Sequence, residues 1–207
     1  MKLYIMRHGE TDWNRQGMMQ GSTDIPLNPY GIELAEQTRD GFLNEGVVFD
    51  RIFSSPLVRA AKTAQIIADG YGLPIKTDLR VQEMGFGKFE GAVIHEIRSN
   101  PKYEGIKAFF IDPANYIPVK GAESYEDVVN RLNSFLTEEI YPLETTCSNI
   151  LIVCHGAVMR CFDRIIAQTP LRDFWAVRQP NCCINVTEIK DGKIHLLQEG
   201  ITYYTIK

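Results

Sequence analysis

The chain has 207 residues, of which 44% are hydrophobic and 23% charged, and this is the composition of an ordinary globular domain. Its formal net charge of −4 argues against a nucleic-acid-binding protein, because such partners require a basic surface. No apolar run approaches the roughly 20 residues of a membrane-spanning helix, and no basic leader with a long apolar core begins the chain. We therefore expect one cytoplasmic domain over residues 1–207, without a membrane partner.

The first part of the chain alternates short apolar runs with helical patterns. This alternation predicts strands joined by crossover helices, and hence a largely parallel sheet. The expected elements are a strand at Lys2–Met6, a helix at Gly31–Leu43, a strand at Arg51–Phe53, a helix at Pro56–Tyr71 and a short extended piece at Ile75–Thr77.

The alternation of strands and helices is interrupted between residues 92 and 120. This segment contains prolines and aromatic residues, with a short helix expected at Val93–Ser99. A long helix at Ser124–Tyr141 follows, with Ser124 as its N-cap and Asp127 three residues on, close to a capping box. The remaining expected elements are a strand at Ile150–Cys154, a helix at Ala157–Ala167, and two strands near Cys183–Ile189 and Lys193–Glu199 that turn at Asp191-Gly192. The whole predicts an α/β three-layer sandwich: a mostly parallel central sheet with an antiparallel edge, and helices on both faces.

Five cysteines occur without a C-x-x-C motif or a ligand-like spacing. Three of them lie in apolar patterns, so we interpret them as core thiols of a protein in a reducing compartment. A disulfide between the adjacent Cys182 and Cys183 is the alternative. No two histidines have the i, i+4 spacing of a helical metal site, and no metal is expected.

The most informative motif is Arg7-His8-Gly9, at the end of the first apolar run. The strand at residues 150–154 ends in the same way, in His155-Gly156. If the two strands are parallel neighbours, both imidazoles reach the carboxyl edge of the sheet, where open α/β folds bind ligands. An ordinary strand end, with a solvated arginine, is the alternative for either motif taken alone.

A third strand leads through Ser54-Ser55-Pro56 into a helix whose first turn carries Arg59. Arginine presents a planar fork of donors that suits phosphate, and histidine is a nucleophile or proton carrier at neutral pH. Arg7, Arg59 and His155 would supply the positive charge that holds transferring oxygens. The helix after Gly156 would add its free N–H groups. Phosphoryl transfer is the first hypothesis.

Four segments together resemble the signature blocks of the histidine phosphatase superfamily, also called phosphoglycerate-mutase-like. They are Arg7 to Thr11, Ser54 to Ala60, Glu83 to Gly91, and Cys154 to Gly156, in the expected order. The resemblance implies that His8 becomes phosphorylated, that His155 is the second pocket histidine and that Glu83 is the acid. It also implies that Asn14 and Gln20 line the phosphate site and that no metal or cofactor takes part.

Several other polar residues remain open. Glu10 could orient an arginine or a histidine, and Glu90 fits a supporting or surface carboxylate, although either could share the acid role with Glu83. His95 and His195 fit structural positions better than catalytic ones. Met18 and Met19 could flank the pocket entrance or belong to the core.

Three functions are compatible with the sequence. The first is a phosphomonoesterase acting on a small phosphorylated metabolite through phosphorylated His8. The second is a cofactor-dependent phosphoglycerate mutase, but the Gly-Phe-Gly-Lys-Phe-Glu-Gly sequence after Glu83 is closer to the phosphatase branch. The third is a non-catalytic phosphate-binding protein of the same fold. Segment 92–120 would cap the site and set specificity, its aromatic residues suiting a partly apolar leaving group. The oligomeric state stays open.

Overall fold

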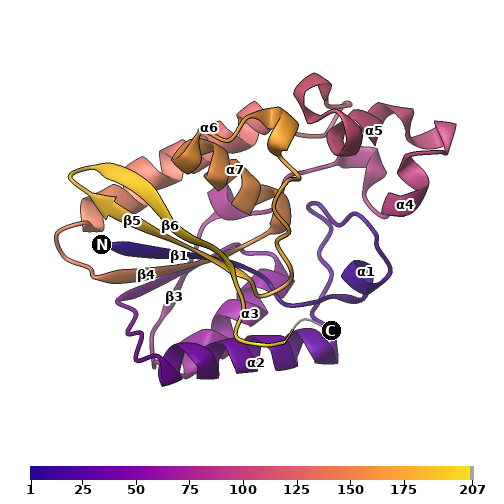
Figure 1. Cartoon of the computed structure of the whole chain (residues 1–207). Coiled ribbons are helices and arrows are strands. Elements are labelled where there is room, and N and C mark those ends of the chain that lie inside the picture. The colour runs from indigo at the N-terminus through magenta and orange to yellow at the C-terminus, as the bar shows by residue number, and fades with distance from the viewer. Residues whose placement is uncertain (206–207) are drawn as a thin grey trace.

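The computed structural model describes residues 1–205 and contains a six-stranded sheet in the order β3-β2-β4-β1-β5-β6 (Figure 1). Strands β1, β4, β2 and β3 are parallel, and β5 and β6 run antiparallel at one edge. The strands are β1 (Lys2–Arg7), β2 (Arg51–Ser54), β3 (Ile75–Thr77), β4 (Asn149–Cys154), β5 (Ile184–Lys190) and β6 (Lys193–Ile201). The predicted α/β fold, with its antiparallel edge, is confirmed.

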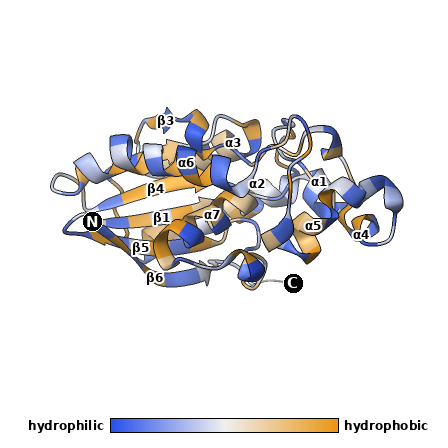
Figure 2. Cartoon of the chain, turned by 90° about the horizontal axis from the view of Figure 1, so that it is seen from above, coloured by the Kyte–Doolittle hydropathy of each residue, from blue (hydrophilic) through white to orange (hydrophobic). Residues whose placement is uncertain are grey.

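The central strands β1 and β4 are buried on both faces of the sheet. Along β1, Leu3 and Ile5 belong to one apolar cluster, whereas Tyr4 and Met6 belong to the other. This is the alternation that a pleated strand between two helical layers requires. Figure 2 shows β1 and β4 hydrophobic along most of their length.

Helices cover each face, as the sequence predicts. Helices α6 (Tyr125–Phe135) and α7 (Gly156–Ala167) lie on one side of the sheet, and α2 (Pro29–Asn44) and α3 (Val58–Asp69) lie on the other (Figure 1). The N-terminus of α6 has the expected capping box, in which Ser124 Oγ accepts a hydrogen bond from the Asp127 N–H and Asp127 accepts one from the Ser124 N–H. No helix of residues 1–205 is long and apolar enough to cross a membrane.

Several helix boundaries differ from the predicted ones, and three of the differences have a clear local cause or form. Helix α2 begins at Pro29 because Asn28 caps it, accepting from the Gly31 N–H. Helix α3 begins at Val58, two residues after Pro56, because Leu57 is still extended. The long helix predicted up to Tyr141 is α-helical only to Phe135, after which it widens into a π-helical turn over Leu136–Ile140.

Segment 92–120 contains more helix than predicted. It holds α4 (Ile94–Ile97), within the expected short helix, and also α5 (Glu104–Ile111), which its prolines and aromatic residues concealed. A further short helix, α1 (Asp12–Arg15), follows the first motif and has its own capping box between Thr11 and Asn14. These three helices lie beyond the carboxyl ends of the parallel strands, on the right of Figure 1.

The five cysteines are all free and buried, which agrees with the core-thiol interpretation. Cys182 and Cys183 are therefore not joined by a disulfide. Burial raises the pKa of the Cys183 thiol to about 12, so it stays protonated at neutral pH.

The loop after β1 is held by a close backbone contact between Gly9, Glu10 and Gly31. A Cβ atom on Gly31 would lie 2.1 Å from the Glu10 carbonyl oxygen, and one on Gly9 would lie 2.4 Å from the Gly31 carbonyl oxygen. Only residues without side chains allow the first turn of α2 to lie this close to the chain that carries His8.

We predict that Gly31→Ala lowers the free energy of unfolding by about 2 kcal/mol or more, since the added methyl group must displace backbone. Urea unfolding measures the change. Gly85→Ala is the matched control, because a Cβ atom there meets nothing closer than Glu123 Oε2 at 3.8 Å. Equal effects for the two variants would contradict the close contact.

Candidate active site

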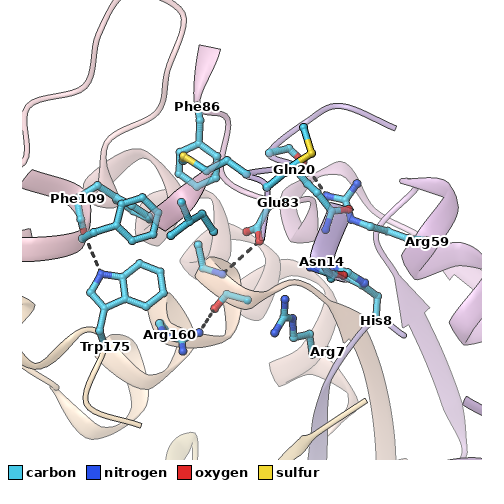
Figure 3. Close-up of a pocket in the computed structure, with 17 residues that line it drawn as sticks. Arg7, His8, Asn14, Gln20, Arg59, Glu83, Phe86, Phe109, Arg160 and Trp175 are labelled. Carbon is cyan, nitrogen blue, oxygen red and sulfur yellow. Dashed lines mark hydrogen bonds between the residues drawn. The ribbon is translucent and has the colours of Figure 1, made fainter. Parts of the chain in front are cut away.

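The two strand-end histidines meet where β1 and β4 end side by side. Arg7 pairs with Cys154 in the parallel register, and His8 and His155 follow on the two strands. Their ring centroids are 5.1 Å apart and both side chains are buried. The predicted juxtaposition of the two motifs is thus present in the structure. A cavity opens in front of His8, lined by residues from both motifs (Figure 3).

His8 is held in one tautomer. Its Nδ1 lies 2.6 Å from the carbonyl oxygen of Gly9. Because a carbonyl can only accept, Nδ1 carries the proton and the lone pair of the neutral ring is on Nε2. Burial, together with the positive charges of Arg59 and Arg7, lowers the pKa of His8 well below its usual range. The ring is therefore neutral at physiological pH, as a nucleophile must be.

Two arginines give the cavity its positive charge. Arg59, in the first turn of α3, is fully buried, and its guanidinium donates to the carbonyl oxygens of Thr23 at 2.8 Å and Gly21 at 2.7 Å. Burial lowers its pKa to about 10, so it stays charged at neutral pH. Arg7 donates to the carbonyl oxygen of Gln179 at 2.7 Å. Because these partners are neutral carbonyls, both charges stay available to an anion.

His155 lies next to His8 and is fully buried. Its Nε2 is 2.8 Å from Ser55 Oγ, and its Nδ1 has no hydrogen-bond partner among residues 1–205. Burial and the charge of Arg59 lower its pKa well below the usual range. The sequence predicts His155 to be one of the cations of the pocket, whereas these surroundings favour a neutral ring. Only a doubly charged anion beside it would favour the protonated form.

Glu83 reaches the same cavity from the other side. Its carboxylate accepts hydrogen bonds from the N–H of Met84 at 2.9 Å and from the N–H groups of Ala157 and Val158 at 3.3 Å. The latter two belong to the first turn of α7, whose free N–H groups attract negative charge. Glu83 therefore has a fixed orientation at the edge of the cationic region.

The remaining predicted site residues also line the cavity: Asn14, Gln20 and Gly156. The Asn14 Oδ1 accepts from Thr11, which leaves its amide N–H groups for another partner. Gln20 is buried, and its Oε1 has no partner among residues 1–205. Both amides are thus positioned to contact a bound molecule.

The two other glutamates are occupied elsewhere. Glu90 accepts from the backbone N–H groups of Ser22, Thr23 and Phe86. Although burial raises its pKa, these bonds and those from the Thr23 and Ser22 hydroxyl groups hold the pKa below its usual value. Glu90 thereby ties together the loop whose carbonyls anchor Arg59. Glu10 accepts from Arg15 and Asn28, at the rim.

The methionines and the other two histidines have the positions expected for them. Met18 and Met19 line the cavity, and Met19 also belongs to the core. His95 and His195 are exposed and lie outside the cavity lining. Among residues 1–205, no group of three or more His, Cys, Asp or Glu side chains is arranged to hold a metal ion.

Arg160 and Trp175 are among the lining residues that sequence reasoning missed. Arg160 donates to the carbonyl of Gly156 at 2.9 Å, and its guanidinium lies 4.6 Å from the ring centroid of Trp175. The Trp175 indole N–H donates to the carbonyl of Phe109 at 2.7 Å, so it bonds to α5 (Figure 3). Arg160 could have been found, because it lies one helical turn after Gly156 on the same face. Trp175 lies in an irregular segment, where periodicity gives no signal.

The cavity thus has two different halves. Arg7, His8 and Arg59 form a cationic half around a free imidazole nitrogen. Phe109, Phe110 and Trp175 form an aromatic half, with Arg160 between the two (Figure 3). Such a cavity can hold a tetrahedral anion against a nucleophile while an organic group lies against the rings.

Comparisons with known proteins agree with this arrangement. Residues 3–202 match the family model described as the histidine phosphatase superfamily, branch 1. A Hydrogenobacter thermophilus protein assigned as a phosphoserine phosphatase is 32% identical over 188 residues, which are 91% of this chain and 88% of the relative. A Yersinia pestis protein assigned as the phosphoglycerate mutase GpmB is 29% identical over 193 residues, which are 93% and 86% of the two chains. The structure of Bacillus stearothermophilus YhfR superposes with a TM-score of 0.84 at 30% identity, over 98% of each chain.

Proposed function

We propose that this chain, which belongs to branch 1 of the histidine phosphatase superfamily, is a phosphomonoesterase that hydrolyses a small phosphorylated metabolite through a phosphohistidine on His8. The observation that carries the proposal is the tautomer of His8: Nδ1 bonds to Gly9, and the lone pair on Nε2 remains free beside two arginines. A nucleophile next to uncompensated positive charge suits attack on a phosphoryl group.

In the first step, the Nε2 lone pair of His8 attacks phosphorus and the bond from phosphorus to the ester oxygen breaks. Arg7 and Arg59 stabilise the charge on the phosphoryl oxygens. Asn14, Gln20 and Gly156, which line the cavity, contact the same oxygens, while the buried His155 lies next to His8. The leaving oxygen takes a proton from the carboxyl group of Glu83.

In the second step, the Glu83 carboxylate takes a proton from water. The hydroxide oxygen bonds to phosphorus, the phosphorus–nitrogen bond breaks, and its electron pair returns to His8 Nε2. Inorganic phosphate leaves, and His8 and Glu83 regain their starting forms. Because these side chains complete the cycle, the proposed reaction requires neither a metal nor a cofactor. The free, buried thiols suit a cytoplasmic location.

The outer half of the cavity suggests the substrate class. Segment 92–120 contributes Phe109 and Phe110 as a cap, which favours a leaving group with apolar surface. Arg160 adds a cation beyond the phosphate site. Phosphoserine and phosphoglycerate, for which two relatives are named, both carry a carboxylate. We propose that the substrate of this chain also carries a second anionic group, which pairs with Arg160.

A phosphoglycerate mutase is the second candidate, favoured by the relative assigned as GpmB. It would use the same phosphohistidine but return the phosphoryl group to an organic hydroxyl. Measuring 3-phosphoglycerate mutase activity beside phosphate release separates the two functions. A phosphate-binding protein without turnover would show neither activity.

We predict that His8→Ala abolishes phosphate release and phosphoenzyme formation while the far-UV circular dichroism spectrum is kept, because only the nucleophile is lost. Labelling with a 32P-phosphorylated substrate, followed by acid treatment, checks for the acid-labile phosphohistidine. If the variant carries an acid-labile label at normal yield, His8 is not the phosphorylated nucleophile.

The Glu83→Gln variant should slow alkyl phosphates far more than p-nitrophenyl phosphate, because p-nitrophenolate is a weak base that leaves with little proton donation. Single-turnover measurements isolate the first step, in which the difference arises. Glu10→Gln and Glu90→Gln are the comparison variants. Equal losses for both substrates in Glu83→Gln, with a selective loss in either comparison variant, would move the acid role to that residue.

For Arg160→Met, we predict that kcat/KM falls about tenfold or more for phosphoserine and 3-phosphoglycerate but changes little for propyl phosphate, since a charge-assisted hydrogen bond contributes about 1.5–3 kcal/mol. Arg164→Met is the matched control, because Arg164 lies one turn further along α7 and outside the cavity lining. Parallel losses on all three substrates would show that Arg160 does not read a second anion.

A further inference from the structure

The segment at residues 177–182, which we call the rear segment, lies against the site just before β5 begins. Its carbonyl groups hold both arginines on this side of the cavity. Arg7 Nη1 donates to the carbonyl of Gln179 at 2.7 Å, and Arg160 Nη2 donates to the carbonyl of Val177 at 3.1 Å. The position of the rear segment therefore sets where the two guanidinium groups lie.

The rear segment also holds the backbone around His8. The Asn181 side-chain amide donates to the carbonyl oxygens of His8 and Gly9, both at 3.1 Å, and lies 3.2 Å from Asn14 Oδ1. The Cys182 N–H is shared between the carbonyls of Arg7 at 3.1 Å and His8 at 3.2 Å. A shift of the rear segment would thus reach both the phosphate-binding arginine and the nucleophile.

A buried carboxylate lies behind this segment. Asp163, on α7, is 8% exposed, and its Oδ2 accepts from Gln179 Nε2 at 2.8 Å. Its Oδ1 accepts from Asn185 Nδ2 at 3.0 Å. The Gln179 side chain is itself 98% covered, and its Oε1 has no partner among residues 1–205, so Asp163 is the group that orients it. The same glutamine residue provides the carbonyl that holds Arg7.

We propose that Asp163 is a positioning residue for Arg7: its ionised carboxylate orients the Gln179 amide and so fixes the carbonyl that holds the Arg7 guanidinium toward the cavity. The proposal rests on the proposed function only in assigning Arg7 to phosphate binding. Asp163 does not line the catalytic cavity and takes no part in proton transfer.

The surroundings of Asp163 make its hydrogen bond to Gln179 sensitive to pH. Burial and the charge of Glu199 on β6 raise its pKa from 3.8 to about 6, against the hydrogen bonds from Gln179 and Asn185 and the charge of Arg160 on its own helix. The other titratable groups nearby include Asp173, which lines the same small cavity as Asp163, and the buried thiols of Cys154 and Cys183, which stay neutral. Below pH 6, a carboxyl proton would face one of the two amide donors, and that hydrogen bond would be lost.

Ionisation of Asp163 has opposite effects on two properties. It strengthens the positioning of Gln179 but lowers the free energy of unfolding. Because folding raises the pKa of Asp163, its contribution to the free energy of unfolding is complete below pH 4 and is lost as pH rises through 6. The charged form is therefore retained at neutral pH at a cost in stability. A purely structural acceptor would be served better by a neutral side chain.

The test is the dissociation constant of Asp163→Asn for inorganic phosphate, measured by isothermal titration calorimetry at pH 7.5 and 5.5. We expect about tenfold weaker binding than in the wild type at pH 7.5, since a small misplacement of a binding group costs this much or more. At pH 5.5 the ratio should fall to about threefold, because roughly three quarters of the wild-type carboxyl groups are then protonated at a pKa of about 6. The ionisation of phosphate itself cancels in the ratio.

Thr169→Val is the matched control, because Thr169 bonds to the backbone carbonyl of Asp163 and not to its carboxylate. It should bind phosphate as the wild type does at both pH values. Gln179→Met removes the amide but keeps the anchoring carbonyl. It should reproduce the loss, and combining it with Asp163→Asn should add nothing further. If Asp163→Asn does not fold, as judged by circular dichroism, Gln179→Met carries the test alone.

Binding within twofold of the wild type at pH 7.5, or a ratio that is the same at both pH values, would overturn the positioning role. A wild type that binds phosphate but hydrolyses no ester overturns the proposed hydrolysis alone, and the binding ratios still test Asp163. A wild type that binds no phosphate overturns both.

Discussion

Two guanidinium groups placed beside one buried imidazole set the conditions for the rest of the site. Burial lowers the pKa of His8 and the charges of Arg59 and Arg7 lower it further, so the ring keeps the lone pair that a nucleophile needs. The same charges attract the anion that this lone pair would attack. Burying a guanidinium is costly unless its N–H groups are bonded, and this need explains why loops from distant parts of the chain converge on the cavity.

Those loops are in turn held by carboxylates that do not touch the cavity. Glu90 gathers the N–H groups of residues 22, 23 and 86, and so fixes the carbonyls that receive Arg59. Asp163 has the equivalent place behind Arg7, through Gln179. The site therefore consists of an inner ring of neutral carbonyls around the arginines and an outer ring of carboxylates that position the carbonyls. Glu83 is the carboxylate that lines the cavity itself, whereas Glu90 and Asp163 lie outside its lining.

Much of this could be predicted from the sequence, for a physical reason. Parallel strands buried on both faces read as apolar runs, and a histidine directly after such a run must lie at the carboxyl edge, as His8 and His155 do. The position of Arg59 was predictable because it lies in the first turn of the helix that follows β2, and that turn starts at the carboxyl edge of the sheet. Trp175 was not, since its place depends on a long-range bond to α5 and not on local periodicity. The same holds for α5, whose helix is stabilised by the packing of Phe109 in the core. The ionisation of His155 depends on neighbours from three other elements, which no local pattern contains.

The carbonyl anchors have a consequence for how such a site can diverge. A main-chain carbonyl is present whatever side chain the residue carries, so the anchor that Val177 gives Arg160 survives most substitutions at an exposed position. Substitutions in these loops therefore leave the backbone anchors of the arginines in place. The aromatic half differs in this respect, since each substitution at Phe109, Phe110 or Trp175 changes the shape of the cavity directly. Under the proposed function, descendants of this chain can therefore exchange one leaving group for another over evolutionary time while the cationic half stays the same.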